Sequence, residues 1–300
     1  MTTPSQPGRL YGVGVGPGDP ELLTVKAQRV LQSVPVIIYA DSLVPEEIAG
    51  FAKPGAIIYG SKEMALPEIM EVTLQAVSEG KTVARIQSGD PSLYGATLEQ
   101  MRILERERVD YEIIPGVSAA FAAAAVLKAE LTVPEVSQTV IMTRAEGRVA
   151  MPEGESLIDL ARHGSTLVIF LSVTRMFRIA NQLQEAGYPA DTPVAVAYRV
   201  GWPDQQIIRG TLTDIAEKVR DAKITLQALI IVGKAVDPNL LDPASDERVA
   251  VSHLYSDEYT HLYRRAGQGD HAAADRTELY EAGGYEVQPE RAVHTSTGDD

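Results

Sequence analysis

The sequence alternates short β-branched runs with segments of helical period, and this alternation limits the possible folds more than any other feature. In the first part of the chain, strand-like runs occupy residues 11–15, 35–40, 83–87 and 111–114, each followed by turn residues and a helical segment. A repeated strand–helix order is typical of a parallel sheet flanked by helices. We therefore predict an N-terminal α/β domain over residues 9–117.

The pattern breaks near Val133-Pro134 and then resumes. It predicts a second α/β domain over residues 118–245, with helices at 156–162, 175–186 and 213–222. Its strands are expected at residues 139–143, 166–171, 193–198, 206–209 and 227–232.

The last part of the chain has a different composition. Residues 267–300 contain two Arg against eight acidic residues and few branched apolar side chains, which is typical of an acidic, disordered tail. We interpret residues 246–266 as an extension that packs on the folded body. No role for the tail follows from its sequence.

Charge and cysteine content exclude several classes of function. The chain has 300 residues, 27 Lys plus Arg against 41 Asp plus Glu, and a net charge of −14, so it should repel nucleic acids. It contains no Cys, which excludes disulfides, thiolate metal sites and Cys nucleophiles. Its longest small-apolar stretch, 116–127, is shorter than the roughly 18 residues of a membrane span. We expect a cytoplasmic protein with no metal and no nucleic-acid or membrane partner.

A glycine-rich loop follows the first predicted strand. Residues 11–20 read Tyr-Gly-Val-Gly-Val-Gly-Pro-Gly-Asp-Pro. Glycines at a strand end let a ligand approach the backbone, and the start of the next helix offers free N–H groups. Asp19 is a suitable N-cap and Pro20 a suitable first helical residue, for a helix expected to run through residues 22–30.

This loop also permits a dinucleotide-binding interpretation. Such sites need Gly-x-Gly-x-x-Gly, with an acidic residue roughly 20 positions later. Asp41 lies at a suitable distance, but counting from Gly12 the third glycine position is Pro17, and counting from Gly14 it is Asp19. A nicotinamide-dependent dehydrogenase is therefore a weak alternative.

Two further strand exits carry similar loops. Residues 88–95 read Ser-Gly-Asp-Pro-Ser-Leu-Tyr-Gly, and residues 115–119 read Pro-Gly-Val-Ser-Ala. We expect Asp90 and Ser118 each to cap the helix that follows. Because parallel strands deliver their carboxyl ends to the same edge of a sheet, the three loops should meet at one crevice.

Together these loops resemble the tetrapyrrole methylase family, on residues 14–24, 88–91 and 115–119. The resemblance implies two α/β domains, a mainly parallel N-terminal sheet and a mixed C-terminal sheet, with S-adenosylmethionine bound in the cleft between them and S-adenosylhomocysteine as product. Residues 39–44, 121–125 and 143–148 are similar to the branch that methylates precorrin-4 at ring carbon 11 in cobalamin biosynthesis.

The resemblance extends over residues 9–266 and implies a homodimer. Another tetrapyrrole methylase, acting on a different precorrin or on uroporphyrinogen, is the main alternative, and a non-catalytic tetrapyrrole carrier is a remote one. The sequence does not distinguish a metal-free substrate from a cobalt-bearing one.

The site residues that the resemblance implies fall into two groups. The cofactor group is Pro17, Ser88, Gly89, Asp90, Leu93, Ser118, Ala119, Leu171 and Ala228, with the segment 198–200 nearby. For the carboxylate-rich tetrapyrrole, possible cationic anchors are Lys26, Lys62, Arg85, Arg144, Arg148, Arg175, Arg178 and Arg199. We select Arg144, Arg148 and Lys26 from these, together with Asp41 of the branch motif.

Methyl transfer from a sulfonium to carbon needs no enzymic nucleophile, because an electron-rich pyrrole-derived carbon of the substrate can attack directly. Catalysis would then come from alignment of the reacting carbons and from removal of water. We therefore predict no metal, and we assign no residue as a general base.

Overall fold

The computed structural model describes residues 8–245, so the predicted extension 246–266 and the acidic tail 267–300 lie outside the described residues. The first of two sheets has five strands in the order β3-β2-β4-β1-β5, all pairing in parallel. These strands are β1 (Leu10–Gly14), β2 (Val36–Tyr39), β3 (Ile57–Gly60), β4 (Val83–Gln87) and β5 (Tyr111–Ile114).

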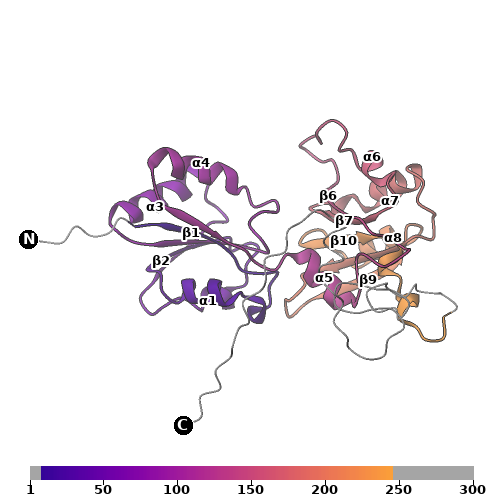
Figure 1. Cartoon of the computed structure of the whole chain (residues 1–300), viewed down its shortest axis with the longest axis horizontal. Helices are drawn as coiled ribbons and strands as arrows, with labels where there is room; N and C mark the ends of the chain where they lie inside the picture. Colours follow the sequence, from indigo (N-terminus) through magenta and orange to yellow (C-terminus); the bar gives the residue numbers. More distant parts are fainter. Residues whose placement is uncertain (1–7, 246–300) are drawn as a thin grey trace, which may run out of the picture. The chain divides into compact units, whose positions relative to one another are not determined.

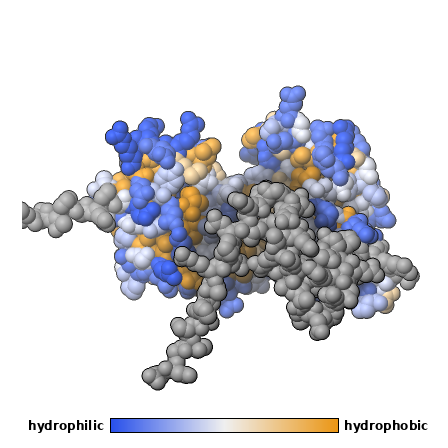
Figure 2. Space-filling model, viewed as in Figure 1, coloured by the Kyte–Doolittle hydropathy of each residue, from blue (hydrophilic) through white to orange (hydrophobic). Residues whose placement is uncertain are grey.

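Helices cover both faces of this sheet (Figure 1). On one face, α1 (Val25–Leu31) and α2 (Glu46–Ala49) pack against apolar side chains of β1, β2 and β4. On the other face lie α3 (Leu66–Ser78) and α4 (Thr97–Glu107). Only Gln100 and Leu104 of α4 are buried, and Figure 2 shows a hydrophilic surface over this helix. The sheet is thus enclosed between two helical layers, as expected for parallel strands.

The second sheet has the order β6-β7-β10-β8-β9 and is mixed, because β6 pairs in parallel with β7 while the other neighbours are antiparallel. Its strands are β6 (Val140–Arg144), β7 (Thr166–Phe170), β8 (Pro193–Tyr198), β9 (Gln206–Thr211) and β10 (Ala228–Val232). The predicted fold class, a parallel sheet followed by a mixed one, is confirmed.

Four helices pack on the second sheet (Figure 1). One face is covered by α5 (Ala119–Leu127), whose small side chains contact Val168, Ala195 and Ile231. The other face carries α6 (Leu157–Ala161), α7 (Met176–Glu185) and α8 (Ile215–Asp221). Short 3₁₀ turns occupy η1 (Pro20–Leu22), η2 (Val173–Arg175), η3 (Lys234–Val236) and η4 (Pro238–Leu241).

The prediction of one continuous helix after the first glycine loop is wrong, because this segment forms a 3₁₀ turn and then a separate α-helix. The turn η1 ends at Leu22, and Leu23 and Thr24 are extended before α1 begins at Val25. The Thr24 hydroxyl accepts a hydrogen bond from the N–H of Ala27 at 3.1 Å, which gives the second piece its own N-cap. Both Asp19 and Thr24 therefore act as caps.

Strand β3 was not among the predicted strands. It pairs only with β2, at the edge of the sheet, and all four of its residues are exposed. The run Ile57-Ile58-Tyr59 has the β-branched and aromatic composition of a strand and was missed, while its exposed position at the edge is set by the tertiary structure.

Between residues 8 and 245, no helix is long and apolar enough to cross a membrane.

Candidate active site

The three glycine loops meet at the carboxyl edge of the first sheet. Strands β1 and β4 are neighbours, but the chain leaves them toward opposite sides, to β2 and to β5. Such a reversal opens a crevice beyond the strand ends. Gly16 and Gly89 exchange backbone hydrogen bonds of 3.2 and 2.7 Å across it. The predicted convergence of the loops is present in the structure.

Glycine is required here because backbones touch. A Cβ atom on Gly116 would lie 2.2 Å from the carbonyl oxygen of Gly89, and one on Gly14 would lie 2.6 Å from the nitrogen of Gly116. Any side chain at these positions would separate the loops. Gly89 itself has φ +66°, a conformation that favours glycine.

Asp90 connects the second loop to the third. Its Oδ1 accepts hydrogen bonds from the backbone N–H and the hydroxyl of Ser92, at 2.9 and 2.5 Å, and its Oδ2 accepts from the N–H of Gly116 at 2.9 Å. Burial alone would raise the pKa of Asp90, but these hydrogen bonds outweigh it and lower the pKa.

The predicted N-cap role of Asp90 is wrong, because a turn follows it and α4 begins only at Thr97. The predicted caps Asp19 and Ser118 are confirmed, although Asp19 caps the 3₁₀ turn η1. Its Oδ1 accepts from the N–H of Glu21, and the Ser118 hydroxyl accepts from the N–H of Ala120.

A cavity of about 720 Å³ opens at this edge and is lined by residues from both sheets. Its volume lies within the roughly 300–1,000 Å³ of small-molecule sites. All nine residues predicted for the cofactor line it: Pro17, Ser88, Gly89, Asp90, Leu93, Ser118, Ala119, Leu171 and Ala228. Arg199 and Val200, from the predicted nearby segment, line it as well. Their binding of a cofactor stays a prediction.

Two long-range hydrogen bonds join the walls of the cavity. The indole Nε1 of Trp202 donates to the carbonyl oxygen of Pro17 at 3.0 Å, and Nε2 of Gln227 donates to the carbonyl oxygen of Ser42 at 2.6 Å. Each bond connects a loop of the first sheet to a loop of the second sheet. The two bonds therefore link the opposite walls of the cavity.

Several wall residues have an unusual backbone. Tyr94, Leu171, Arg199 and Gln227 are non-glycine residues with φ between +45° and +56°, and all four line the cavity. This conformation costs roughly 1–2 kcal/mol per residue, and such strain is concentrated at functional sites. Four of the nine such non-glycine residues between 8 and 245 thus line the cavity, and the other five lie elsewhere.

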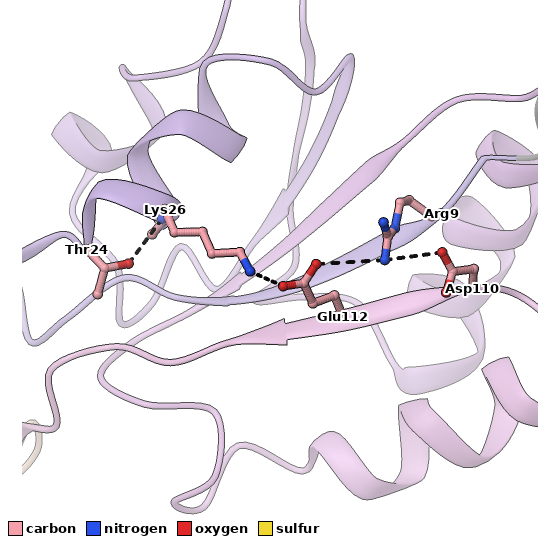
Figure 3. A network of polar contacts seen from close by, with 6 residues as sticks. Arg9, Thr24, Lys26, Asp110 and Glu112 are labelled. Atoms are coloured by element: carbon pink, nitrogen blue, oxygen red, sulfur yellow. Dashed lines mark hydrogen bonds and ion pairs between the residues drawn. The ribbon is translucent and has the colours of Figure 1, made fainter. Parts of the chain in front are cut away.

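The four residues predicted to bind substrate do not line the cavity. Lys26 makes an ion pair with Glu112 on β5, and Glu112 also faces Arg9, which in turn pairs with Asp110 (Figure 3). Lys26 is therefore engaged at the edge of the first sheet.

The other three lie elsewhere too. Asp41 accepts a hydrogen bond from the N–H of Lys62 at 2.7 Å and lies 3.7 Å from its Nζ. Arg144 donates to the carbonyl oxygens of Val149 and Ala150, and the side chain of Arg148 is exposed. Their binding of substrate stays a prediction, because a large substrate can extend beyond the cavity.

The sequence-based prediction did not select two buried polar residues that line the cavity. Arg85 was one of eight possible anchors, and Gln87 was not predicted as a site residue, yet both line the cavity from strand β4. The available signal was a charged and an amide side chain inside a run that is otherwise apolar.

A parallel α/β sheet with glycine loops, facing a mixed sheet across a ligand-sized cavity, defines a class of two-sheet proteins that bind a small molecule between their halves. Residues 9–216 match the model of one family within this class, the Tetrapyrrole (Corrin/Porphyrin) Methylases. The chain belongs to the tetrapyrrole methylase family.

Within this family, the chain is similar to several named precorrin-4 methyltransferases. The cobalt-precorrin-4 C(11)-methyltransferase of Methanocaldococcus jannaschii is 51% identical over 254 residues, covering 85% of this chain and 95% of that protein. The precorrin-4 C(11)-methyltransferase of Pseudomonas aeruginosa is 49% identical, covering 85% and 98%. The X-ray structure of a cobalt-precorrin-4 methyltransferase superposes with a TM-score of 0.75 at 48% identity, covering 77% of this chain and 96% of that one. These comparisons favour the methyltransferase interpretation over the dehydrogenase alternative.

Proposed function

We propose that this protein is a methyltransferase that transfers a methyl group from S-adenosylmethionine to ring carbon 11 of precorrin-4, or of its cobalt complex, and releases precorrin-5 and S-adenosylhomocysteine. Family membership and identities near 50% to enzymes of that name support the reaction. The observation that carries it is the gathering of nine residues, from five separate segments of the chain, around one cavity.

The cavity fits the cofactor. It leaves open space beside the second glycine loop, where a Cβ on Gly89 would have no neighbour nearer than 3.8 Å. It also contains apolar surface from Leu93 and Leu171 and a buried carboxamide oxygen, Oε1 of Gln87, with no partner among residues 8–245. When bound, S-adenosylmethionine supplies an electrophilic methyl group on a sulfonium.

The residues of the chain act by orientation and exclusion of water. The rigid loops around Gly16, Gly89 and Gly116 hold their backbone in one arrangement, which fixes a bound ligand at little entropic cost. Leu93, Leu171 and Val200 contribute apolar surface that removes water from a charged ligand. No side chain has to form a bond to the methyl group, because the substrate carbon is the nucleophile.

The test is mass spectrometry after incubation with S-adenosylmethionine labelled in its methyl group and with metal-free or cobalt-bearing precorrin-4. We expect one labelled methyl group at carbon 11 of at least one of the two substrates. Methylation of uroporphyrinogen or of another precorrin instead would place the protein in a different branch of the family. Tetrapyrrole binding without any turnover would favour a carrier.

Equilibrium binding gives an independent test. We expect S-adenosylhomocysteine to bind and NAD not to bind. Micromolar affinity for NAD with none for S-adenosylhomocysteine would overturn the proposal. The homodimer implied by the family resemblance belongs to the same proposal, and light scattering at several protein concentrations would test it.

A further inference from the structure

Arg85 is a buried cation in the wall of the cavity. It lies on β4 and is 7% exposed, yet it lines the cavity. Its hydrogen bonds are long, since Nη1 lies 3.4 Å from the carbonyl oxygens of Ile38 and Ile86. Its Nε has no partner among residues 8–245. A guanidinium carries five N–H donors, so most of its bonding capacity is unused.

The charge of Arg85 is also not matched within the described part of the chain. Asp41 influences it electrostatically, but the Asp41 oxygens contact Lys62, and no ion pair joins Asp41 to Arg85. Burial lowers the pKa of Arg85, and Asp41 only partly opposes this effect. A buried cation without a paired anion is unfavourable, so an anion that enters the cavity would be bound strongly.

Gln87 complements Arg85 on the same strand. Residues two apart on a strand point to the same face of the sheet, and both side chains line the cavity. Nε2 of Gln87 donates to the carbonyl oxygen of Gly95 at 2.6 Å, which identifies the other amide atom as oxygen. This Oε1 is buried and has no partner in the described residues. The cavity wall therefore offers donors beside an acceptor.

The second arginine of the cavity, Arg199, also has a buried Nε without a partner among residues 8–245, but it differs from Arg85 in how its charge is paired. Arg199 makes an ion pair with Asp204 at 2.5 Å and stacks over the ring of Trp202, with 3.8 Å from Cζ to the ring centroid. Its charge is already matched by a carboxylate and an aromatic face.

We propose that Arg85 binds a carboxylate of the ligand in this cavity, and that Gln87 accepts an N–H hydrogen bond from the same ligand. This inference rests on the proposed function and identifies the polar contacts of its site. Two reactants carry the required chemistry. One is the amino-acid end of the cofactor, with its carboxylate and ammonium, and the other is the tetrapyrrole, with acetate or propionate groups and pyrrole N–H groups.

The experiment makes two measurements on each variant. Calorimetry gives the affinities for S-adenosylhomocysteine and for 5′-methylthioadenosine, which lacks the amino-acid end. Kinetics give the KM for the tetrapyrrole. The variants are Arg85→Gln and Arg85→Lys, which keeps a cation but loses the planar fork. Arg106→Gln on α4 is the matched control, because that arginine is exposed, pairs with Glu107 and lies outside the cavity.

If the carboxylate belongs to the cofactor, Arg85→Gln weakens S-adenosylhomocysteine by about tenfold or more and leaves 5′-methylthioadenosine unchanged. If it belongs to the tetrapyrrole, both adenosine ligands bind as before while KM rises by about tenfold or more at a similar kcat. In either case Arg85→Lys should restore part of the loss, and Arg106→Gln should match the wild type.

A folded Arg85→Gln protein with both affinities and KM unchanged overturns the inference. Thermal unfolding checks the fold. Should Arg85→Gln fail to fold, Arg85→Lys and Gln87→Leu provide the same comparison, with weaker binding expected and unchanged binding contradicting it. Failure of the proposed function is distinguishable, because then the wild type itself would neither bind S-adenosylhomocysteine nor methylate precorrin-4.

Discussion

At the scale of single residues, a few polar atoms hold the glycine loops together. Asp90 satisfies three donors from two loops, and no neutral side chain of the same size could accept all three. The glycines around it contribute by having no side chain. The positions of these loops therefore depend on the Asp90 carboxylate and on glycines where backbones approach closely.

Asp90→Asn should destabilise the protein by about 1–3 kcal/mol at pH 7, because an amide N–H₂ would face the N–H groups of Ser92 or Gly116. The pKa of Asp90 is lowered in the folded state, so its contribution is complete above the unfolded pKa of about 3.9 and is lost as the pH falls through the folded pKa. Urea unfolding of the wild type and of Asp90→Asn, at pH 7 and at pH 3, measures the difference in unfolding free energy at each pH. A difference between the two proteins that is the same at both pH values would contradict this assignment.

Gly116→Ala should cost about 3 kcal/mol or more, since the new Cβ would lie 2.2 Å from the carbonyl oxygen of Gly89. Gly55→Ala is the control. Gly55 has φ +80° and no atom within 4 Å of a built Cβ, so it should lose only the roughly 1–2 kcal/mol of the backbone preference. Chemical denaturation of both variants tests this, and equal losses would show that loop contact is unimportant.

At the scale of elements, short caps decide where helices begin. Thr24 starts α1 after the 3₁₀ turn, and Ser118 starts α5 where the chain passes from the first sheet to the second. Both cap residues have β-region backbone and accept a backbone N–H through the hydroxyl. They differ in place, because only Ser118 lines the cavity.

Ser118→Ala and Thr24→Ala form a matched pair. Each should lose about 1 kcal/mol of unfolding free energy, because each removes one cap. Only Ser118→Ala should also weaken S-adenosylhomocysteine, by several-fold. Thermal unfolding and calorimetry measure the two effects, and equal affinities for the two variants would remove Ser118 from the site.

At the scale of the folded body, residues 8–245, the site exists only because two sheets face one cavity. Trp202 and Gln227 supply hydrogen bonds between loops about 185 residues apart in sequence. Gly201 has φ +83° and lies against Asp19, so the 199–202 loop and the first glycine loop are packed backbone to backbone. The contact between these two loops therefore sets the distance between the two walls of the cavity.

Trp202→Phe should reduce stability by about 1 kcal/mol, because the carbonyl oxygen of Pro17 loses its donor. Affinity for S-adenosylhomocysteine should fall several-fold, while circular dichroism stays unchanged because neither sheet is altered. Tyr59→Phe on the exposed strand β3, outside the cavity, is the control. An unchanged affinity for Trp202→Phe would show that this bond does not position the cavity walls.

Much of the first sheet was predictable, because its buried strands and their glycine exits are local patterns. The nine residues that the family resemblance assigns to the cofactor all line one cavity, and their binding of the cofactor stays a prediction. Strand β3 was missed although Ile57, Ile58 and Tyr59 form a short β-branched and aromatic run, and what the sequence does not give is that this run pairs at an exposed edge. The break at Leu23 and Thr24 depends on a local cap competing with a continuous apolar pattern.

The alternation of strands and helices, the three glycine loops and the family membership could be read from the sequence, because each depends on residues close together in the chain. Which cations remain available for a ligand became visible only in the folded protein. Arg144 was selected from its place in the branch motif and Lys26 as a possible cationic anchor, but folding satisfies both with protein partners. Arg85 enters the cavity wall with unused donors, because a side chain's free bonding capacity depends on neighbours that the fold brings from other strands.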